Sequence, residues 1–255
     1  MRSGLLLVVL VLASCGKDPQ AQNPEASVWD LGGADLKVDS KKLLPDLGAP
    51  PDLGQKLPCD SEWQDAISPQ SKVSTGLVST TEQAGEKVTT VDATAGGMSA
   101  ALSNPYVYVS FEKGGVRADI DDFAARSSMA WDVAFRRAVI RVNGGDSGAA
   151  QGAVAILPGK TLADVTAVPA ASEFKTDDFI DAKCTVKVNP INDIWTAIGG
   201  STGMWYAYDT STMKLTPNAE TYVFRTAKGQ HIKLVIESYY KGSAGANYTL
   251  RWSSL

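Results

Sequence analysis

The last part of the chain alternates hydrophobic and polar residues with a period of two, which is typical of β-strands that bury one face. Three such runs cover residues 221–226, 231–240 and 247–252. They are separated by Lys228-Gly229 and by the glycine-containing segment 241–245, which predicts an antiparallel meander. One apolar face should be formed by Tyr222, Phe224, Ile232, Leu234, Ile236, Tyr248, Leu250 and Trp252.

Residues 129–142 form a longer apolar run in the middle of the chain. Trp131, Val133 and Phe135 would share one face of a strand, with Asp132 and Arg136 on the opposite face. Its aromatic and β-branched residues favour a strand over a helix. Further strands are predicted at residues 106–111, 151–157, 184–188 and 193–198, with a turn at 113–115.

Helical patterns are confined to two short segments, residues 61–67 and 119–125. The predicted fold class is therefore all-β, or β-dominated with one or two short helices, in a single compact antiparallel-sheet domain. About 200 residues can bury a core that needs no metal to hold it together.

The N-terminus has the features of a secretory signal peptide. Met1 and Arg2 precede an apolar stretch at residues 5–12, which is too short to span a bilayer. Residues 12–15, Leu-Ala-Ser-Cys, resemble the bacterial lipobox, so residues 1–14 are predicted to be a lipoprotein signal peptide and Cys15 the lipid-modified residue. The alternative is an ordinary secretory signal with an incidental cysteine. Several acyl chains on Cys15 would hold the protein on a membrane without a transmembrane helix.

Residues 15–57 are predicted to be a lipid-anchored, disordered tether. The unit Asp-Leu-Gly occurs at 30–32, 46–48 and 52–54, and proline precedes the last two units. Such a composition gives an extended spacer with no packed core. The β domain is then expected to cover residues 58–255.

Charge and cysteine content narrow the partners and the compartment. The chain of 255 residues has a net charge of -4 and scattered Lys and Arg residues, which argues against nucleic acid as a partner. In an oxidising compartment, Cys59 and Cys184 are predicted to pair as a disulfide. Two unpaired thiols are the alternative, since sequence does not show proximity.

Residues 145–148, Gly-Asp-Ser-Gly, match the nucleophile tetrapeptide of chymotrypsin-like proteases. That mechanism needs a histidine, which precedes the serine in that family, whereas the single histidine of this chain, His231, follows it. Structural zinc needs about four Cys or His ligands, and once Cys15 carries lipid and Cys59 and Cys184 are paired, this chain offers only His231. The protein is therefore predicted not to be an enzyme, and no metal site is predicted.

Several motifs occur in a fixed order in the second half of the chain. The segment 128–137, with Trp131-Asp132 and Phe135, leads into Asn143-Gly144-Gly145. Residues 205–209, 222–229, 232–234 and 239–240 follow. In sequence and order these motifs resemble the HmuY family of haem-binding surface lipoproteins. The resemblance covers about residues 70–255. It implies a compact β domain of HmuY type that takes haem between ligand-bearing loops, with the ligands in the region after the Asn-Gly-Gly turn.

The sequence departs from the family in its iron ligands. Family members use two histidines or two methionines, but residues 146–203 of this chain contain neither. The remaining candidates for haem ligands are Met204, Met213, Met129 and His231, each of which has packing as its alternative role. Tyrosine ligation stays open.

Two functions follow from the resemblance. The first is capture of haem, or a related tetrapyrrole, by a lipoprotein on the outer membrane or cell surface of a bacterium, with a haem-carrying protein as a partner. The second is a non-haem interaction or structural lipoprotein on the same scaffold that binds protein, peptide or glycan. The oligomeric state is left open.

Overall fold

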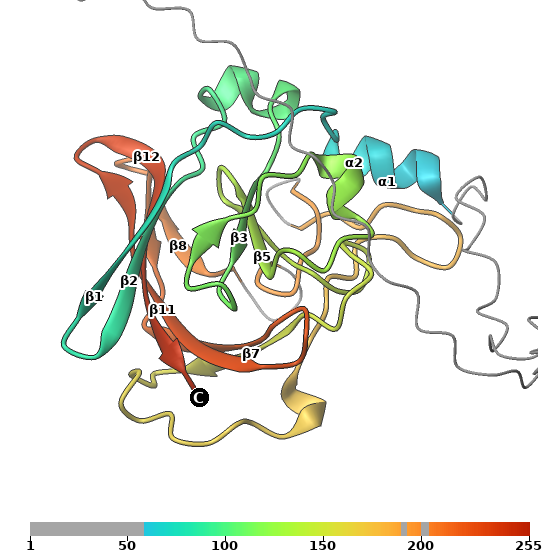
Figure 1. The fold of residues 1–255 in the computed structure, drawn as a ribbon. Coiled ribbons are helices and arrows are strands. Elements are labelled where there is room, and N and C mark those ends of the chain that lie inside the picture. Colours follow the sequence, from blue (N-terminus) through green and yellow to red (C-terminus); the bar gives the residue numbers. More distant parts are fainter. Residues whose placement is uncertain (1–58, 190–192, 200–203) are drawn as a thin grey trace, which may run out of the picture. The chain divides into compact units, whose positions relative to one another are not determined.

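The computed structural model describes residues 59–189, 193–199 and 204–255, and all elements within them belong to one compact unit. A six-stranded antiparallel sheet has the order β1-β2-β12-β11-β10-β7 and curves along one side of a smaller sheet (Figure 1). Its strands are β1 (Val78–Gln83), β2 (Glu86–Asp92), β7 (Ala153–Pro158), β10 (Glu220–Arg225), β11 (His231–Lys241) and β12 (Ala244–Ser254).

The smaller sheet has four strands in the order β4-β3-β5-β6, and a separate hairpin joins β8 and β9. These strands are β3 (Val107–Ser110), β4 (Val116–Arg117), β5 (Val133–Arg136), β6 (Val139–Val142), β8 (Tyr206–Asp209) and β9 (Lys214–Pro217). The helices are short: α1 (Asp60–Ile67), α2 (Asp122–Ala125), and the 3-10 turns η1 (Met98–Ser103) and η2 (Ala171–Glu173). The β-dominated antiparallel fold predicted from the sequence is therefore confirmed.

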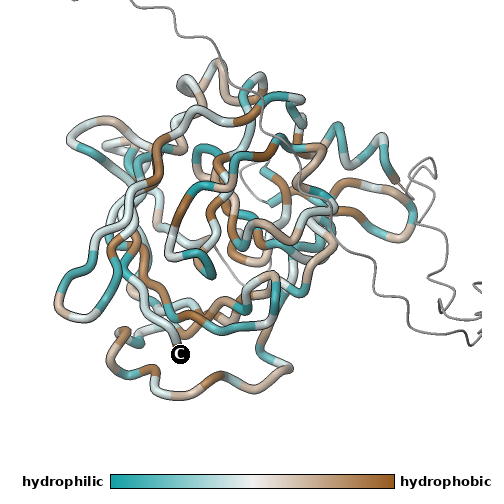
Figure 2. Tube along the Cα trace, in the orientation of Figure 1, coloured by the Kyte–Doolittle hydropathy of each residue, from teal (hydrophilic) through white to brown (hydrophobic). Residues whose placement is uncertain are grey.

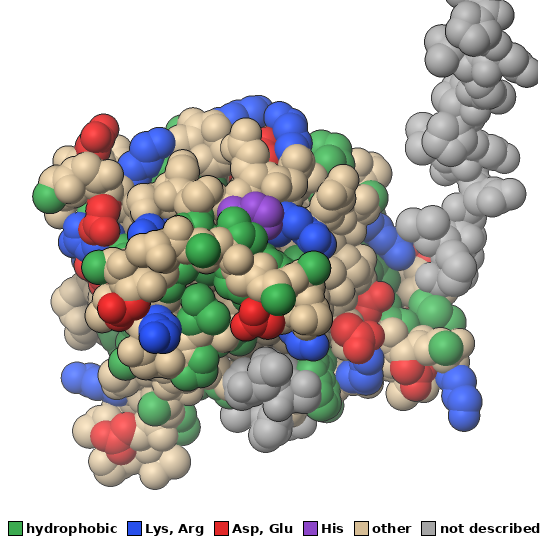
Figure 3. Space-filling view, turned by 90° about the horizontal axis from the view of Figure 1, so that it is seen from below, with side chains coloured by type: hydrophobic (Ala, Val, Ile, Leu, Met, Phe, Trp, Pro, Cys, Tyr) green, Lys and Arg blue, Asp and Glu red, His purple; other side chains and the backbone are tan. Residues whose placement is uncertain are grey.

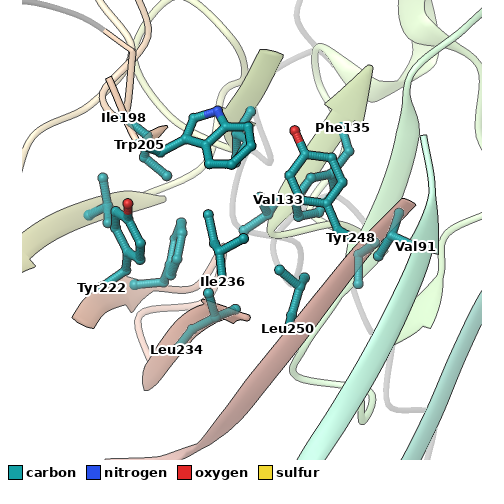
Figure 4. Packing of buried hydrophobic residues seen from close by; sticks show 14 of the residues in the cluster. Val91, Val133, Phe135, Ile198, Trp205, Tyr222, Leu234, Ile236, Tyr248 and Leu250 are labelled. Carbon is teal, nitrogen blue, oxygen red and sulfur yellow. The ribbon is translucent and has the colours of Figure 1, made fainter. Parts of the chain in front are cut away.

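The main core lies between the two sheets. Alternate residues of β10, β11 and β12, among them Tyr222, Leu234 and Leu250, point toward Val133 and Phe135 of the smaller sheet (Figure 4). Hydrophobic residues are accordingly concentrated on the strands, and the β1–β2 turn is hydrophilic (Figure 2). The predicted meander is confirmed with its antiparallel register, and its predicted apolar face lies wholly in this core.

The prediction of one strand over residues 129–142 is wrong. Two strands, β5 and β6, form a hairpin there, and the turn between them consists of Arg137, with φ of 52°, and Ala138. Neither residue is a usual turn former, so the sequence carries no signal for this turn. Trp131 precedes β5 and does not share a face with Val133 and Phe135. It packs instead against Tyr108, with ring centroids 4.9 Å apart, in a second cluster.

The predicted polar face of this run is also wrong, because both of its charged residues are buried. The carboxylate of Asp132 accepts hydrogen bonds from the backbone N–H groups of Phe111, Glu112 and Ala227. The guanidinium of Arg136 donates to the carbonyl groups of Ile67 and Ser68 where α1 ends. Backbone groups from other elements thus replace water around both charges.

The predicted helix at 61–67 is confirmed as α1, whereas only Asp122–Ala125 of the segment 119–125 is helical. The predicted disulfide is confirmed: Cys59 and Cys184 are bonded, with Cα atoms 5.1 Å apart. It ties the start of α1 to a loop that follows β7 by more than twenty residues.

Among the described residues, no helix has the length and hydropathy needed to cross a membrane. The predicted signal peptide, Cys15 and the tether lie outside the described residues.

Candidate functional site

Three short extended segments, at 178–180, 186–188 and 194–196, lie next to one another in the region that follows β7. Isolated bridges join Ile180 to Val186 and Val188 to Ile194. Lys187 N–H donates to the carbonyl of Phe179 over 2.8 Å, and Trp195 N–H donates to that of Lys187 over 3.2 Å. The strands predicted at 184–188 and 193–198 therefore exist only as single bridges, because each segment pairs at too few positions to continue a ladder.

An open cleft of about 400 Å³ lies beside these segments. Its first wall is residues 174–178, which include Phe174, Lys175 and Asp178, and its second wall is residues 195–197, which begin with Trp195. Volumes of this order are typical of small-molecule sites. The cleft thus presents two partly exposed aromatic side chains together with charged groups.

Phe174 is held at the edge of the six-stranded sheet. The next residue, Lys175, exchanges backbone hydrogen bonds with Val154 of β7 over 2.8 and 2.9 Å. The Phe174 ring meets the ring of His231 edge-on at 5.5 Å, and the Arg225 guanidinium lies 5.7 Å from the Phe174 centroid. Burial, together with the nearby charge of Arg225, lowers the pKa of His231, which favours the neutral imidazole.

Two cations near the first wall have no carboxylate partner. Lys175 is exposed, and within the described part of the chain neither Lys175 nor Arg225 takes part in an ion pair. Asp178, by contrast, is paired with Lys187 over 2.6 Å. A ligand that carries carboxylates would therefore meet uncompensated positive charge on this side of the cleft.

The buried carboxylate of Asp177 connects the two walls. It lies between two lining residues of the first wall, Thr176 and Asp178, but points away from the cleft surface into the protein. It accepts hydrogen bonds from Ala197 N–H of the second wall over 2.8 Å and from Val142 N–H of β6 over 3.0 Å. Ser147 donates its hydroxyl to the same carboxylate, and Arg141 donates to Ser147. One fully buried side chain thus links the two walls by hydrogen bonds.

Burial raises the pKa of Asp177 to about 6, although its hydrogen bonds and Arg141 act in the opposite direction. The folded state therefore binds this proton more tightly than the unfolded state does. The contribution of Asp177 to stability is full below its ordinary pKa of 3.8 and is lost as the pH rises toward 6. Urea unfolding of wild type and Asp177→Asn at pH 4 and pH 7 should show a larger stability advantage of wild type at pH 4. An advantage that grows toward pH 7 would contradict this assignment.

The sequence-predicted haem ligands are not brought together at this cleft. Met129 and Met213 are exposed, and the sulfur of Met213, in the β8–β9 turn, accepts a hydrogen bond from the hydroxyl of Tyr208 in β8. Met204 is partly buried against the main core, with its sulfur 3.7 Å from the amide nitrogen of Asn189. His231 touches Phe174 but does not itself line the cleft.

The protease-like segment 145–148 has a structural role. Ser147 is buried between Arg141 and Asp177, while Asp146 accepts the backbone N–H groups of Phe179 and Ile180. The predicted Asn-Gly-Gly bend is present, and a Cβ on Gly145 would lie 2.0 Å from the carbonyl oxygen of Asp177. Glycine is needed there because the first wall passes directly against the turn.

Among the described residues, the only group of potential metal ligands close enough to share an ion is Cys59, Glu62 and Cys184. Both sulfur atoms are in the disulfide, so the group does not offer two thiolates.

Sequence reasoning missed Phe174, Trp195 and Asp177. Trp195 and Phe174 stand in segments of mixed polarity, and an isolated aspartate gives no sign that it will be buried. The region after the Asn-Gly-Gly turn contains three aromatic residues, and sequence alone does not separate Phe174 and Trp195 from the buried Phe179.

The fold and this cleft define a class of protein: an antiparallel β protein with an aromatic-walled cleft formed by loops beside its sheet. The family model described as HmuY protein matches residues 103–253, which is more than half of the chain and includes both walls. The chain belongs to the HmuY family.

Solved structures show similar chains at low identity. A protein of Bacteroides fragilis NCTC 9343, named as a candidate lipoprotein, is 19% identical, with 68% of this chain and 91% of that chain covered and a TM-score of 0.44. The apo HmuY analogue TFO of Tannerella forsythia is 16% identical, with 71% and 96% covered and a TM-score of 0.45. A protein of Bacteroides vulgatus ATCC 8482, named as a candidate HmuY-like haem-binding protein, is 17% identical, with 66% and 90% covered and a TM-score of 0.42. No curated protein matches the chain.

Proposed function

We propose that this protein is a lipid-anchored binding protein that captures haem or a related tetrapyrrole in the cleft between Phe174 and Trp195. The observation that carries the proposal is the family match, since it spans both walls of the cleft. The protein acts as a binder and not as an enzyme. The buried Ser147 has a fully structural set of partners, in keeping with this proposal.

The chemistry of the cleft suits a flat ligand with acidic side groups. Aromatic side chains offer apolar faces for a conjugated ring, and Phe174 and Trp195 stand on different walls. Lys175, an exposed lining residue, would meet a carboxylate at the rim. In Figure 3, hydrophobic side chains gather across the middle of the face seen from below, with Lys and Arg side chains beside them.

The proposed cellular setting depends on Cys15. Lipid on this residue would place the protein on the outer membrane or cell surface, and the residues before the β domain would give the cleft distance from the bilayer. The natural partners would then be the membrane, through the lipid, and haem, either free or on a haem-carrying protein.

A haemin titration of the chain with Cys15→Ser, which lacks the lipid acceptor, tests the function. We expect a Soret shift that saturates at micromolar haemin, and about tenfold weaker binding for Trp195→Ala because one apolar wall is lost. Phe123→Ala is the matched control, since this aromatic residue is 45% exposed on α2, outside the cleft. Without any spectral change at micromolar haemin, the proposal would be wrong, and a protein, peptide or glycan ligand would take its place.

A further inference from the structure

The cleft lacks the side chains that normally hold haem iron. Residues 146–203, which contain both walls, include no histidine, methionine or tyrosine, and the only cysteine among them, Cys184, is in the disulfide. Haem proteins bind the metal through imidazole, thioether, thiolate or phenolate groups. The donor chemistry of this cleft therefore does not fit axial ligation of iron.

Two side chains from neighbouring segments, His231 and Met204, carry atoms that can bind iron, but both pack against other residues of the protein. His231 lies with its ring against Phe174, on the outer side of β11, and Met204 packs on the main core near Asn189. Neither residue lines the cleft.

Tyrosines near Met204 are equally unsuited to bind iron as phenolates. Tyr206 and Tyr239 are buried among other aromatic rings. Burial raises the pKa of each of them to about 12, so both phenols keep their protons at neutral pH.

What the cleft does offer is recognition of a ring and its acidic substituents. Phe174 and Trp195 supply apolar side chains, while Lys175 supplies a cation that has no carboxylate partner in the described part of the chain. None of these interactions involves a metal at the centre of the ring.

We infer that the cleft selects the tetrapyrrole ring and its carboxylates and not the iron, so that iron-free protoporphyrin binds as tightly as haemin. This inference rests on the proposed function, since it takes the tetrapyrrole as the ligand class. It assigns Lys175 as the residue of the cleft that recognises a carboxylate.

The test compares haemin and protoporphyrin IX on the full chain with Cys15→Ser, using quenching of tryptophan fluorescence. We expect dissociation constants that agree within about threefold, since an added iron ligand would separate them by more than tenfold. Lys175→Ala should weaken the binding of both ligands by about threefold, as expected for loss of one exposed ion pair. Met204→Leu should leave haemin affinity and the haemin absorption spectrum unchanged. His231→Ala, which removes a ring packed against Phe174, should change the affinities for haemin and protoporphyrin equally.

The outcomes separate the two proposals. Binding of haemin more than tenfold tighter than protoporphyrin would overturn the inference and leave the proposed function standing. A variant Met204→Leu or His231→Ala that loses affinity for haemin but keeps its affinity for protoporphyrin would also overturn the inference, because it would reveal an iron ligand. The proposed function would still stand. Failure of both ligands to bind at micromolar concentration would overturn the proposed function and the inference together. Equal affinities for haemin and protoporphyrin, both reduced in Trp195→Ala, would support the proposed function and the inference.

Discussion

Loss of the Cys59–Cys184 disulfide is expected to lower the free energy of unfolding by about 4 kcal/mol. The two cysteines are 125 residues apart in sequence, so the bond removes much conformational freedom from the unfolded chain. It also fastens α1 to the loop that precedes the segment 186–188, next to the second wall of the cleft. Urea unfolding of the chain with Cys15→Ser, with and without reductant, measures the effect.

The double variant Cys59→Ser and Cys184→Ser provides the comparison for this experiment. Its stability should equal that of the reduced protein and should not respond to reductant. A difference of less than about 1 kcal/mol between oxidised and reduced protein would show that other contacts hold α1 in place.

Replacement of Asp177 by alanine is expected to cost about 3 kcal/mol of stability. The change leaves the buried N–H groups of Val142 and Ala197 without an acceptor, and each such group costs about 1–3 kcal/mol. The same change separates the walls of the cleft, since Ala197 is tied to the first wall through this carboxylate. Ligand affinity should therefore fall together with stability, and chemical unfolding and haemin titration measure the two effects.

Asp178→Ala is the matched control because it removes the neighbouring carboxylate. Asp178 has a side chain 71% exposed and pairs only with Lys187 at the surface, so its loss should change stability by less than about 1 kcal/mol. Equal effects of the two alanine substitutions would contradict the role assigned to Asp177.

Some parts of the fold could be predicted from the sequence, and others could not. The meander of β10, β11 and β12 was visible because it combines regular alternation with glycine-containing turns. The hairpin of β1 and β2 was missed, since its strands contain few apolar residues and its turn is Ala84-Gly85. Both turn residues have positive φ, a conformation that alanine rarely adopts, so no usual turn signal is present.

The candidate site was largely beyond prediction. Its two walls lie about twenty residues apart in irregular segments, where there is no hydrophobic period to follow. The methionines and His231 carry atoms that can bind haem iron, which is why the sequence suggests them as ligands. Only the packing of their side chains shows that they lie outside the cleft.

By itself the sequence determined the β-dominated class, the antiparallel meander and the kinship with the HmuY family. These features depend on local periodicity, on residue type and on the order of motifs, all of which can be read from the sequence alone. Only the tertiary structure decided that Asp132, Arg136 and Asp177 are buried, and that Phe174 and Trp195 face one cleft. Burial of a charge depends on backbone groups supplied by distant segments, and such partners are brought together only by folding.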